Sequence, residues 1–456
     1  MFKEIRDLKP ASVSIFVLGL VASWLFSLSL GMTIVGAQAS KTDAGQQFSA
    51  VGGLQIALTT LAVLMCLPSV VKVAIRRDSR RIALWQVIGA SPRSARARYL
   101  SIVAFSALAG SAVGGFLAFL SWPSFGKVIA YTGFLMLPAL SDPLTVWAWT
   151  FGPGTAFIVL ILALLLGTRQ LNKIEPVEAV AETPEPVPSR RVGRAIFSII
   201  IVFGMIASYI AIAATPKIQD PQKLSGLLSS YWGTALGLLI AYGISDRAIV
   251  RPVVQLVGHL IPLANLDSWV IARTSARRRA TLSTSVITPL VVAAASVGSV
   301  FGMVNQTKNV TIALGAKEAD LQVSPTSQIV LIFSAPVVIA AFSGVIAVYL
   351  TNRWRKHDIA LLGALGASAS SIRWSAVFEC LIYFVSAVLI STLILGINAA
   401  AIGAALGHGP VPKAGPVWVG NETYYLLIAG FSLLAFSIVI PTFHETKTID
   451  MAAIVQ

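Results

Sequence analysis

R-R-D-S-R-R-I-A-L-W-Q-V-I-G-A-S-P-R-S-A-R-A-R is the sequence from Arg76 to Arg98, a charged island between two long apolar segments. A related island runs from Arg353 to Ser375, at a constant offset of 277 residues. Seven residues of the first island, Ile82, Ala83, Leu84, Gly89, Ala90, Ser91 and Arg96, recur as Ile359, Ala360, Leu361, Gly366, Ala367, Ser368 and Arg373. The recurrence of these residues at one offset indicates a duplicated unit that acts at a membrane surface.

The composition around these islands is that of a membrane protein. Apolar residues make up 56% of the chain and charged residues 12%, which is about half the charged fraction of an average soluble domain. The formal net charge of +15 would suit a nucleic-acid-binding protein, but the distribution of the charges argues against one. The two cysteines, Cys66 and Cys380, both lie in apolar segments, so we expect neither a disulfide framework nor a cysteine zinc site.

The apolar segments predict about ten transmembrane helices. A helix needs about 20 mostly apolar residues to cross the hydrocarbon layer. A segment that crosses this layer must be helical, because unpaired backbone amides are costly in lipid. The segments that qualify are 11–36, 49–75, 99–121, 146–168, 193–215, 229–250, 281–303, 328–350, 374–405 and 423–443. The fold class predicted by the sequence is therefore an all-α polytopic membrane protein.

The basic residues predict the orientation of these helices. With ten spans, 27 of the 34 Lys and Arg residues lie on the side that holds both termini and both islands. Positive residues are retained on the cytoplasmic side of a membrane, so we expect both termini to be cytoplasmic in the plasma (cytoplasmic) membrane. The same asymmetry accounts for most of the basic charge, and no nucleic-acid partner is expected.

The repeat divides the chain into four expected parts. Residues 1–10 predict an interfacial helix, and residues 11–180 predict a first four-span unit. Residues 181–265 hold a Pro-rich connector followed by spans five and six, which link the units. Residues 266–456 predict a second interfacial helix and a second four-span unit. Spans five and six have no counterpart in the repeat.

Two further patterns predict helix packing and membrane anchoring. Gly110 and Gly114 form a GxxxG motif in the third span, which favours close packing against another helix within the fold. Several aromatic residues fall at the predicted external ends of the spans, where they would anchor the protein in the interface. They are Trp122, Trp147, Trp149, Tyr231, Trp232, Trp418, Tyr424 and Tyr425.

The motif I-A-L-x4-G-A-S, placed between the second and third spans of a four-span unit, resembles the FtsX-like permease family of ABC transporters. Each unit also closes with a similar tail, marked by Ile174-Glu175 and Ile449-Asp450. The duplicated ten-span layout is similar to permeases of antimicrobial-peptide resistance, but it lacks their large external domain. The resemblance implies export or extraction of an amphiphilic compound, such as an antimicrobial peptide, a lipid or a hydrophobic toxin.

The resemblance also implies a partner. No G-x-x-x-x-G-K-[ST] loop occurs, so ATP and Mg would be bound by a separate ABC ATPase, with two copies for each permease chain. This chain itself is not expected to be an enzyme or to hold a cofactor or metal. Ile82 to Ile88 and Ile359 to Leu365 are expected to form two short coupling helices that dock on this ATPase. Gly89 and Gly366 should end them, and Ser91 and Ser368 should begin the helices that follow.

Glu379 is a carboxylate inside a predicted span, where the family often has a glutamate. A charge in the membrane costs about 2.5 to 3.5 kcal/mol on insertion scales, so a functional role is one hypothesis. The other is that the side chain extends to the interface or pairs with Arg373.

Two other functions remain compatible with the sequence. One is a non-transporting regulator that passes ATPase motion to an external partner such as a cell-wall hydrolase. Its short external loops offer little surface for such a partner, which would need about 800 Å². The other is an ion-coupled secondary transporter with internal repeats, for which a single intramembrane carboxylate is weak support.

Overall fold

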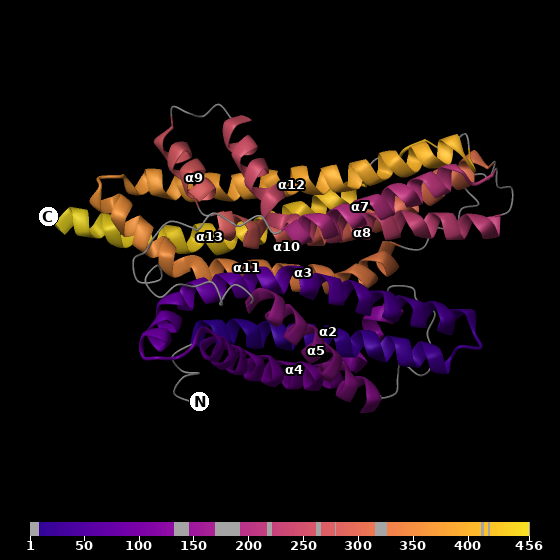
Figure 1. The fold of residues 1–456 in the computed structure, drawn as a ribbon, viewed down its shortest axis with the longest axis horizontal. Coiled ribbons are helices and arrows are strands. Elements are labelled where there is room, and N and C mark those ends of the chain that lie inside the picture. The colour runs from indigo at the N-terminus through magenta and orange to yellow at the C-terminus, as the bar shows by residue number, and fades with distance from the viewer. Residues whose placement is uncertain are drawn as a thin grey trace. The chain divides into compact units, whose positions relative to one another are not determined.

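The computed structural model describes residues 9–131, 146–168, 192–216, 221–260, 266–278, 280–314, 326–411, 415–417 and 420–455. These residues are almost entirely helical, and none of them forms a strand. The helices are α2 (Lys9–Gln38), α3 (Asp43–Val87), α4 (Pro92–Tyr131), α5 (Val146–Thr168), α7 (Val192–Ala213), α8 (Pro221–Leu260), α9 (Asp267–Arg278), α10 (Ala280–Ala313), α11 (Thr326–Ala364), α12 (Ala369–His408) and α13 (Asn421–Val455) (Figure 1). The all-helical prediction is confirmed for this part of the chain.

Nine of the described helices are long and apolar enough to cross a membrane. They lie at nine of the ten expected positions. The tenth position, expected at 229–250, lies in α8, where the segments Gly233–Asp246 and Ala248–His259 meet at an angle of 81°. The bend follows Asp246, and by length and composition α8 is one broken span or a re-entrant segment. The expected interfacial helix at 1–10 and the Pro-rich connector fall largely outside the described residues.

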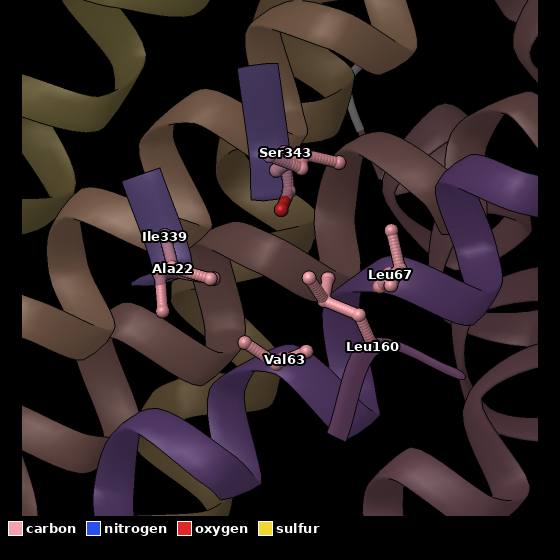
Figure 2. A pocket seen from close by; sticks show the side chains of 7 residues that line it. Ala22, Val63, Leu67, Leu160, Ile339 and Ser343 are labelled. Carbon is pink, nitrogen blue, oxygen red and sulfur yellow. The ribbon is translucent and has the colours of Figure 1, made fainter. Parts of the chain in front are cut away.

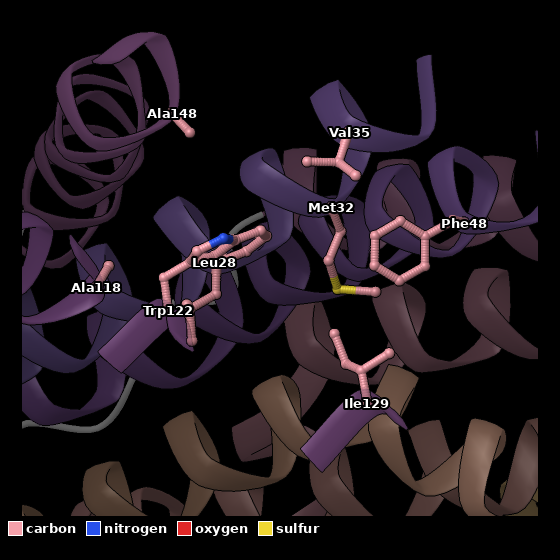
Figure 3. Packing of buried hydrophobic residues seen from close by; sticks show 8 residues of the cluster. All are labelled: Leu28, Met32, Val35, Phe48, Ala118, Trp122, Ile129 and Ala148. Atoms are coloured by element: carbon pink, nitrogen blue, oxygen red, sulfur yellow. The ribbon is translucent and has the colours of Figure 1, made fainter. Parts of the chain in front are cut away.

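The chain forms two compact units, and the first contains Met1–Val187 and Pro325–Trp354. In this unit α2 packs against α3, α4 and α5. Its core joins α2, α3, α4 and α5 through Leu28, Met32, Val35, Phe48, Ala118, Trp122, Ile129 and Ala148 (Figure 3). The Trp24 indole N–H donates to the Ser121 hydroxyl at 2.8 Å, which adds a polar link between α2 and α4.

Gly110 and Gly114 give α4 its close approach to α2. A Cβ atom at Gly110 would collide with the carbonyl oxygen of Phe16, and one at Gly114 would collide with that of Leu20. The Ser23 hydroxyl donates to the Ser111 carbonyl at 2.7 Å in the same contact. The GxxxG motif therefore serves packing within the fold, as the sequence predicts.

The second unit contains Pro188–Ser324 and Arg355–Gln456. The linking helices α7 and α8 belong to this unit, where both pack against α12. Helix α9, expected as an interfacial helix, also packs on α12, and its Trp269 is buried with its ring at 5.6 Å from that of Phe378. The two linking spans are thus extra helices around the second copy of the repeat.

Three helix pairings of the first repeat recur in the second. Helix α2 packs on α4 and α5, which pack on each other, and the corresponding α10, α12 and α13 do the same. Helix α11, which corresponds to α3, differs because its residues up to Trp354 group with the first unit. The compact units therefore do not coincide with the sequence boundaries of the repeat.

Two of the expected interfacial aromatic residues are core residues instead. Trp122 and Tyr231 are almost fully buried, in the cores of the first and second units respectively. The prediction was wrong for these two because position along a span does not reveal which face of the helix a ring occupies. Trp147 and Tyr425 are 65% and 69% exposed, which is compatible with membrane anchoring.

A buried hydrogen-bond network fixes the linking helices to α12. The Tyr209 hydroxyl of α7 donates to the Asn398 Oδ1 atom at 2.8 Å, and the Asn398 amide donates to the Tyr231 carbonyl of α8 at 3.2 Å. Asn398 has no exposed surface, so one α12 side chain serves two neighbouring helices.

We expect Asn398→Ala to destabilise the second unit by about 1 to 3 kcal/mol, because it leaves the half-buried Tyr209 hydroxyl and the Tyr231 carbonyl without this partner. Thermal unfolding in detergent measures the loss. A double-mutant cycle with Tyr209→Phe should give a coupling energy of about 0.6 to 1.7 kcal/mol, the range for hydrogen bonds in membrane proteins. If the effects of the two substitutions on stability were simply additive, Tyr209 and Asn398 would not be coupled as the network requires.

Candidate functional site

The first island forms a sharp turn between α3 and α4. Helix α3 ends at Val87 with Ile88 as its C-cap, and Gly89 has a φ angle of 104°. The Gly89 N–H donates to the Gln86 carbonyl at 3.0 Å, and the Ala90 N–H donates to the Trp85 carbonyl at 2.9 Å. These two bonds define a Schellman motif, in which glycine takes the left-handed conformation. The Ser91 hydroxyl then accepts a bond from the Ser94 N–H at 3.2 Å and caps α4.

The second island repeats this geometry bond for bond. Gly366 has a φ angle of 86°, and its N–H donates to the Gly363 carbonyl at 3.0 Å. The Ala367 N–H donates to the Leu362 carbonyl at 2.9 Å, which completes the second Schellman motif. Ser368 is the N-cap of α12, where its hydroxyl accepts from the Ser371 N–H at 3.1 Å. The predicted helix ends and caps are confirmed at both turns.

One part of the prediction was wrong. Ile82 to Ile88 and Ile359 to Leu365 were expected to form separate short helices, but they are the last turns of the long helices α3 and α11. The charged residues that precede them do not interrupt a helix, because Arg and Lys are good helix formers with long side chains that can extend to water. Each turn is thus the end of a long helix that contains a candidate membrane span.

Both turns expose the same apolar positions, whose exposed fractions match closely. Leu84 and Leu361 are each 50% exposed, and Ile88 and Leu365 are 84% and 83% exposed. On the other side of each turn, Ile82 and Ile359 are buried and anchor it. Ala83 is buried whereas Ala360 is exposed, so the two turns differ at this position. An exposed apolar tip on a buried anchor is suited to insertion into a groove of another protein.

The two turns belong to different compact units, so each is described by itself. Around the first turn, the guanidinium of Arg98 lies 5.3 Å from the centre of the Trp85 ring. Sequence reasoning did not single out Asp78, which is 5% exposed and interacts electrostatically with Arg77 and Arg81. The signal in the sequence that could have identified Asp78 is its position among the arginines of the first island.

We expect Gly89→Ala and Gly366→Ala each to weaken its turn by about 1 to 2 kcal/mol, the cost of a left-handed conformation for a residue with a Cβ atom. No heavy atom lies near the ideal Cβ position at either glycine, so backbone strain is the whole effect. Faster amide hydrogen exchange at residues 85–95 or 362–372 measures it. Asn variants, which tolerate this conformation, are the control and should keep near-native protection.

Glu379 lies on the buried face of α12, 8% exposed, and its Oε1 atom accepts a hydrogen bond from the Tyr383 hydroxyl at 2.7 Å. Arg373 donates from Nε to the Thr446 hydroxyl at 2.8 Å, and its guanidinium lies 5.6 Å from the centre of the Phe443 ring. A side chain that extended to the headgroups would be exposed, whereas the Glu379 side chain is buried. The carboxylate is therefore part of the helix packing of the second unit.

A small pocket in the first unit is lined by Leu18, Ala22, Val63, Leu67, Leu160, Ile339 and Ser343 (Figure 2). The Ser343 hydroxyl is its polar group, and it has no hydrogen-bond partner among the described residues. The lining does not offer the set of polar groups that would orient a cofactor or substrate. Among the described residues, no group of three or more His, Cys, Asp or Glu side chains could hold a metal ion.

The described helices and the two exposed turns define the class of this protein. Its long apolar helices indicate an all-helical, multi-pass membrane protein. Comparison with protein families, with curated proteins and with solved structures finds no significant match to the chain.

Proposed function

We propose that the chain is the permease subunit of an ABC transporter, and that it couples ATP hydrolysis by a separate ATPase to export or extraction of an amphiphilic compound. The observation that carries this proposal is the duplicated turn, with the same caps and the same exposed apolar positions in both copies. Repeated surface geometry of this kind is best explained by a partner that has two equal grooves.

A dimer of identical ATPase subunits offers two such grooves. Leu84 with Ile88 would fill one groove, and Leu361 with Leu365 would fill the other. Since α3 and α11 run without a break into these turns, a displacement at either turn would pass directly into a membrane-spanning helix. ATP and Mg would be bound in the partner, because the sequence has no phosphate-binding loop.

The proposed orientation follows from the charges. The asymmetry of Lys and Arg supports cytoplasmic termini and cytoplasmic turns in the plasma membrane, where the ATPase has access to ATP. The substrate would reach the permease laterally from the lipid. An amphiphilic compound concentrates in that layer, so a large external binding domain is unnecessary.

Glu379 is the proposed functional carboxylate of the second unit. We expect Glu379→Gln to reduce transport about tenfold or more while ATPase binding persists, because the variant keeps the shape and the Tyr383 contact but removes the charge. Transport by reconstituted vesicles measures the effect. Tyr383→Phe is the companion variant, since it keeps the charge and removes the hydrogen bond. Full transport by Glu379→Gln would leave Glu379 a structural role only.

The first test of the proposal is whether the gene for an ABC ATPase lies next to the gene for this chain. The two proteins are co-expressed, purified and reconstituted in liposomes, and ATP hydrolysis is measured with cationic peptides, lipids and hydrophobic toxins. We expect a stable complex whose ATPase activity rises with one class of amphiphile and whose vesicles move that compound. An ATPase lacking its nucleotide-binding lysine is the control. A chain that forms no complex with any ATPase would refute the proposal.

A further inference from the structure

A polar contact in the second unit joins the end of α8 to α9. His259 lies in the last turn of α8, and Arg273 lies on α9. The Arg273 Nη2 atom is 2.6 Å from the His259 Nε2 atom, and the His259 Nδ1 atom is 2.6 Å from the Gln255 carbonyl oxygen. Both ring nitrogens of His259 are therefore in use, one toward its own helix and one toward the neighbouring helix.

Gly258 provides the space for this contact. A Cβ atom at Gly258 would lie 3.1 Å from the Arg273 Cγ atom, which is tighter than ordinary van der Waals contact. The methylene groups of Arg273 thus lie against the backbone of α8, and the guanidinium group reaches the imidazole beyond it. Arg273 is half-buried, whereas His259 is exposed, so a proton can reach the ring.

The two partners of His259 specify its protonation state. A guanidinium group can only donate hydrogen bonds, so the Nε2 atom must accept and carry no proton. A backbone carbonyl can only accept, so the Nδ1 atom must carry the proton and donate it. Together the two partners require the neutral Nδ1–H tautomer. The contact between α8 and α9 therefore exists only while His259 is neutral.

Protonation of His259 would remove the acceptor of this contact. The new Nε2–H group would point at a guanidinium that cannot accept a hydrogen bond, and two positive charges at this distance repel each other. The bond from Nδ1–H to the Gln255 carbonyl would persist, because the last turn of a helix favours a cation. A proton would thus keep the ring on α8 and release Arg273. Histidine is the side chain that changes its charge between about pH 5 and 8.

The surrounding charges leave this contact as the determining one. Arg273 is the charged group that hydrogen-bonds to His259 within the described part of the chain. The other charged residues described on the helices packed here make no hydrogen bond or ion pair with the imidazole. They are Asp246 and Arg251 of α8, Asp267 and Arg277 of α9, Lys308 of α10, and Arg373 and Glu379 of α12.

We propose that His259 and Arg273 form a pH-sensitive switch, in which their hydrogen bond holds α9 to α8 while His259 is neutral and is broken when His259 takes up a proton. Helix α9 also packs on α12, where the Trp269 ring lies against that of Phe378. Acidification therefore detaches the end of α8 from α9 while α9 stays on α12. The switch does not depend on the proposed transport function.

The first test follows the imidazole in the wild-type chain. The full chain, with its histidines labelled with nitrogen-15, is purified in detergent and titrated from about pH 8 to 5 by NMR, the range in which histidine changes its charge. The signals of His259 are identified by their loss in His259→Gln. We expect the neutral Nδ1–H tautomer at the alkaline end and the protonated ring at the acidic end. An Nε2–H tautomer at the alkaline end, or a ring that stays neutral throughout, would overturn the proposal.

The second test measures how firmly α9 is held. Amide hydrogen exchange at residues 267–278 is compared at the two ends of the titration, after correction for the intrinsic effect of pH on exchange. In the wild type we expect about fivefold lower protection at the acidic end, the effect of losing one hydrogen bond. His259→Gln should show high protection at both ends, because its amide oxygen can accept from Arg273 and does not titrate. Arg273→Gln should show low protection at both ends.

His408→Gln is the matched control. His408 is also an exposed histidine in the last turn of a long helix, α12, so its substitution should leave the pH dependence of α9 as in the wild type. Equal protection of wild-type α9 at both ends of the titration would overturn the proposal, and this measurement needs no variant. The proposal would also fail if His259→Gln kept the pH dependence of the wild type, or if His408→Gln abolished it.

Discussion

Replacing Leu84 and Leu361 together by Asp is expected to abolish co-purification with the proposed ATPase partner. Each leucine is half-exposed at the tip of its turn, and burying its exposed half in a groove contributes about 0.8 to 1.5 kcal/mol. Loss at both turns would cost about 1.5 to 3 kcal/mol, which is about tenfold to a hundredfold in affinity. An aspartate in an apolar groove adds a desolvation penalty to this loss.

The controls separate docking from folding. Leu84→Met with Leu361→Met conserves volume and apolar character, so the double Met variant should bind the ATPase nearly as well as the wild type. Each single Asp variant should lose part of the affinity, because one turn remains intact. Thermal unfolding of the double Asp variant should stay close to that of the wild type, since both side chains are half-exposed. Undiminished ATPase binding by that folded variant would show that the turns are not docking elements.

The largest loss of stability is expected from Gly110→Leu or Gly114→Leu. At both positions even a Cβ atom would overlap a backbone carbonyl oxygen of α2, and backbone cannot move aside as a flexible side chain can. Overpacking costs about 1 to 3 kcal/mol in ordinary cores, and separation of two helices along their contact would cost more. We expect most of each variant to be lost as aggregated protein in size-exclusion chromatography, with a lowered unfolding temperature for the remainder.

Gly53→Leu is the matched control for this prediction. Gly53 lies on α3 of the same unit, and nothing lies within 4 Å of its ideal Cβ position. The substitution has the same chemistry in open space and should leave the unfolding temperature within a few degrees of the wild type. If Gly53→Leu and Gly110→Leu were equally damaging, the close contact of α4 with α2 would not be the cause.

The local features of the turns could be read directly from the sequence. A glycine that follows an apolar helix end, and a serine two residues later, predict a Schellman motif and an N-cap because these structures depend on a few neighbouring residues. Both copies have them, at Gly89 with Ser91 and at Gly366 with Ser368. The positions of the membrane-spanning helices were also predictable, since lipid requires long apolar runs.

Other features depend on contacts between distant parts of the chain. Residues 82–88 continue α3, Trp122 and Tyr231 are core residues, and α7 and α8 attach to α12 through Asn398. None of these follows from the pattern of apolar residues, because lipid and protein core are both apolar and a membrane-spanning helix has little polarity contrast between its faces. The repeat likewise did not reveal that α11 up to Trp354 groups with the first unit.

The sequence by itself thus determined where the helices lie, that the turn between the second and third spans is duplicated, and how glycine and serine shape that turn. The tertiary structure decided which face of each helix is buried and that both turns expose Leu84 or Leu361 at the same fraction. The physical reason is the separation, along the chain, of the residues that interact. Helix length, caps and left-handed glycines are set by interactions between neighbours in sequence, whereas burial and helix pairing are set by the fit of surfaces far apart in the chain.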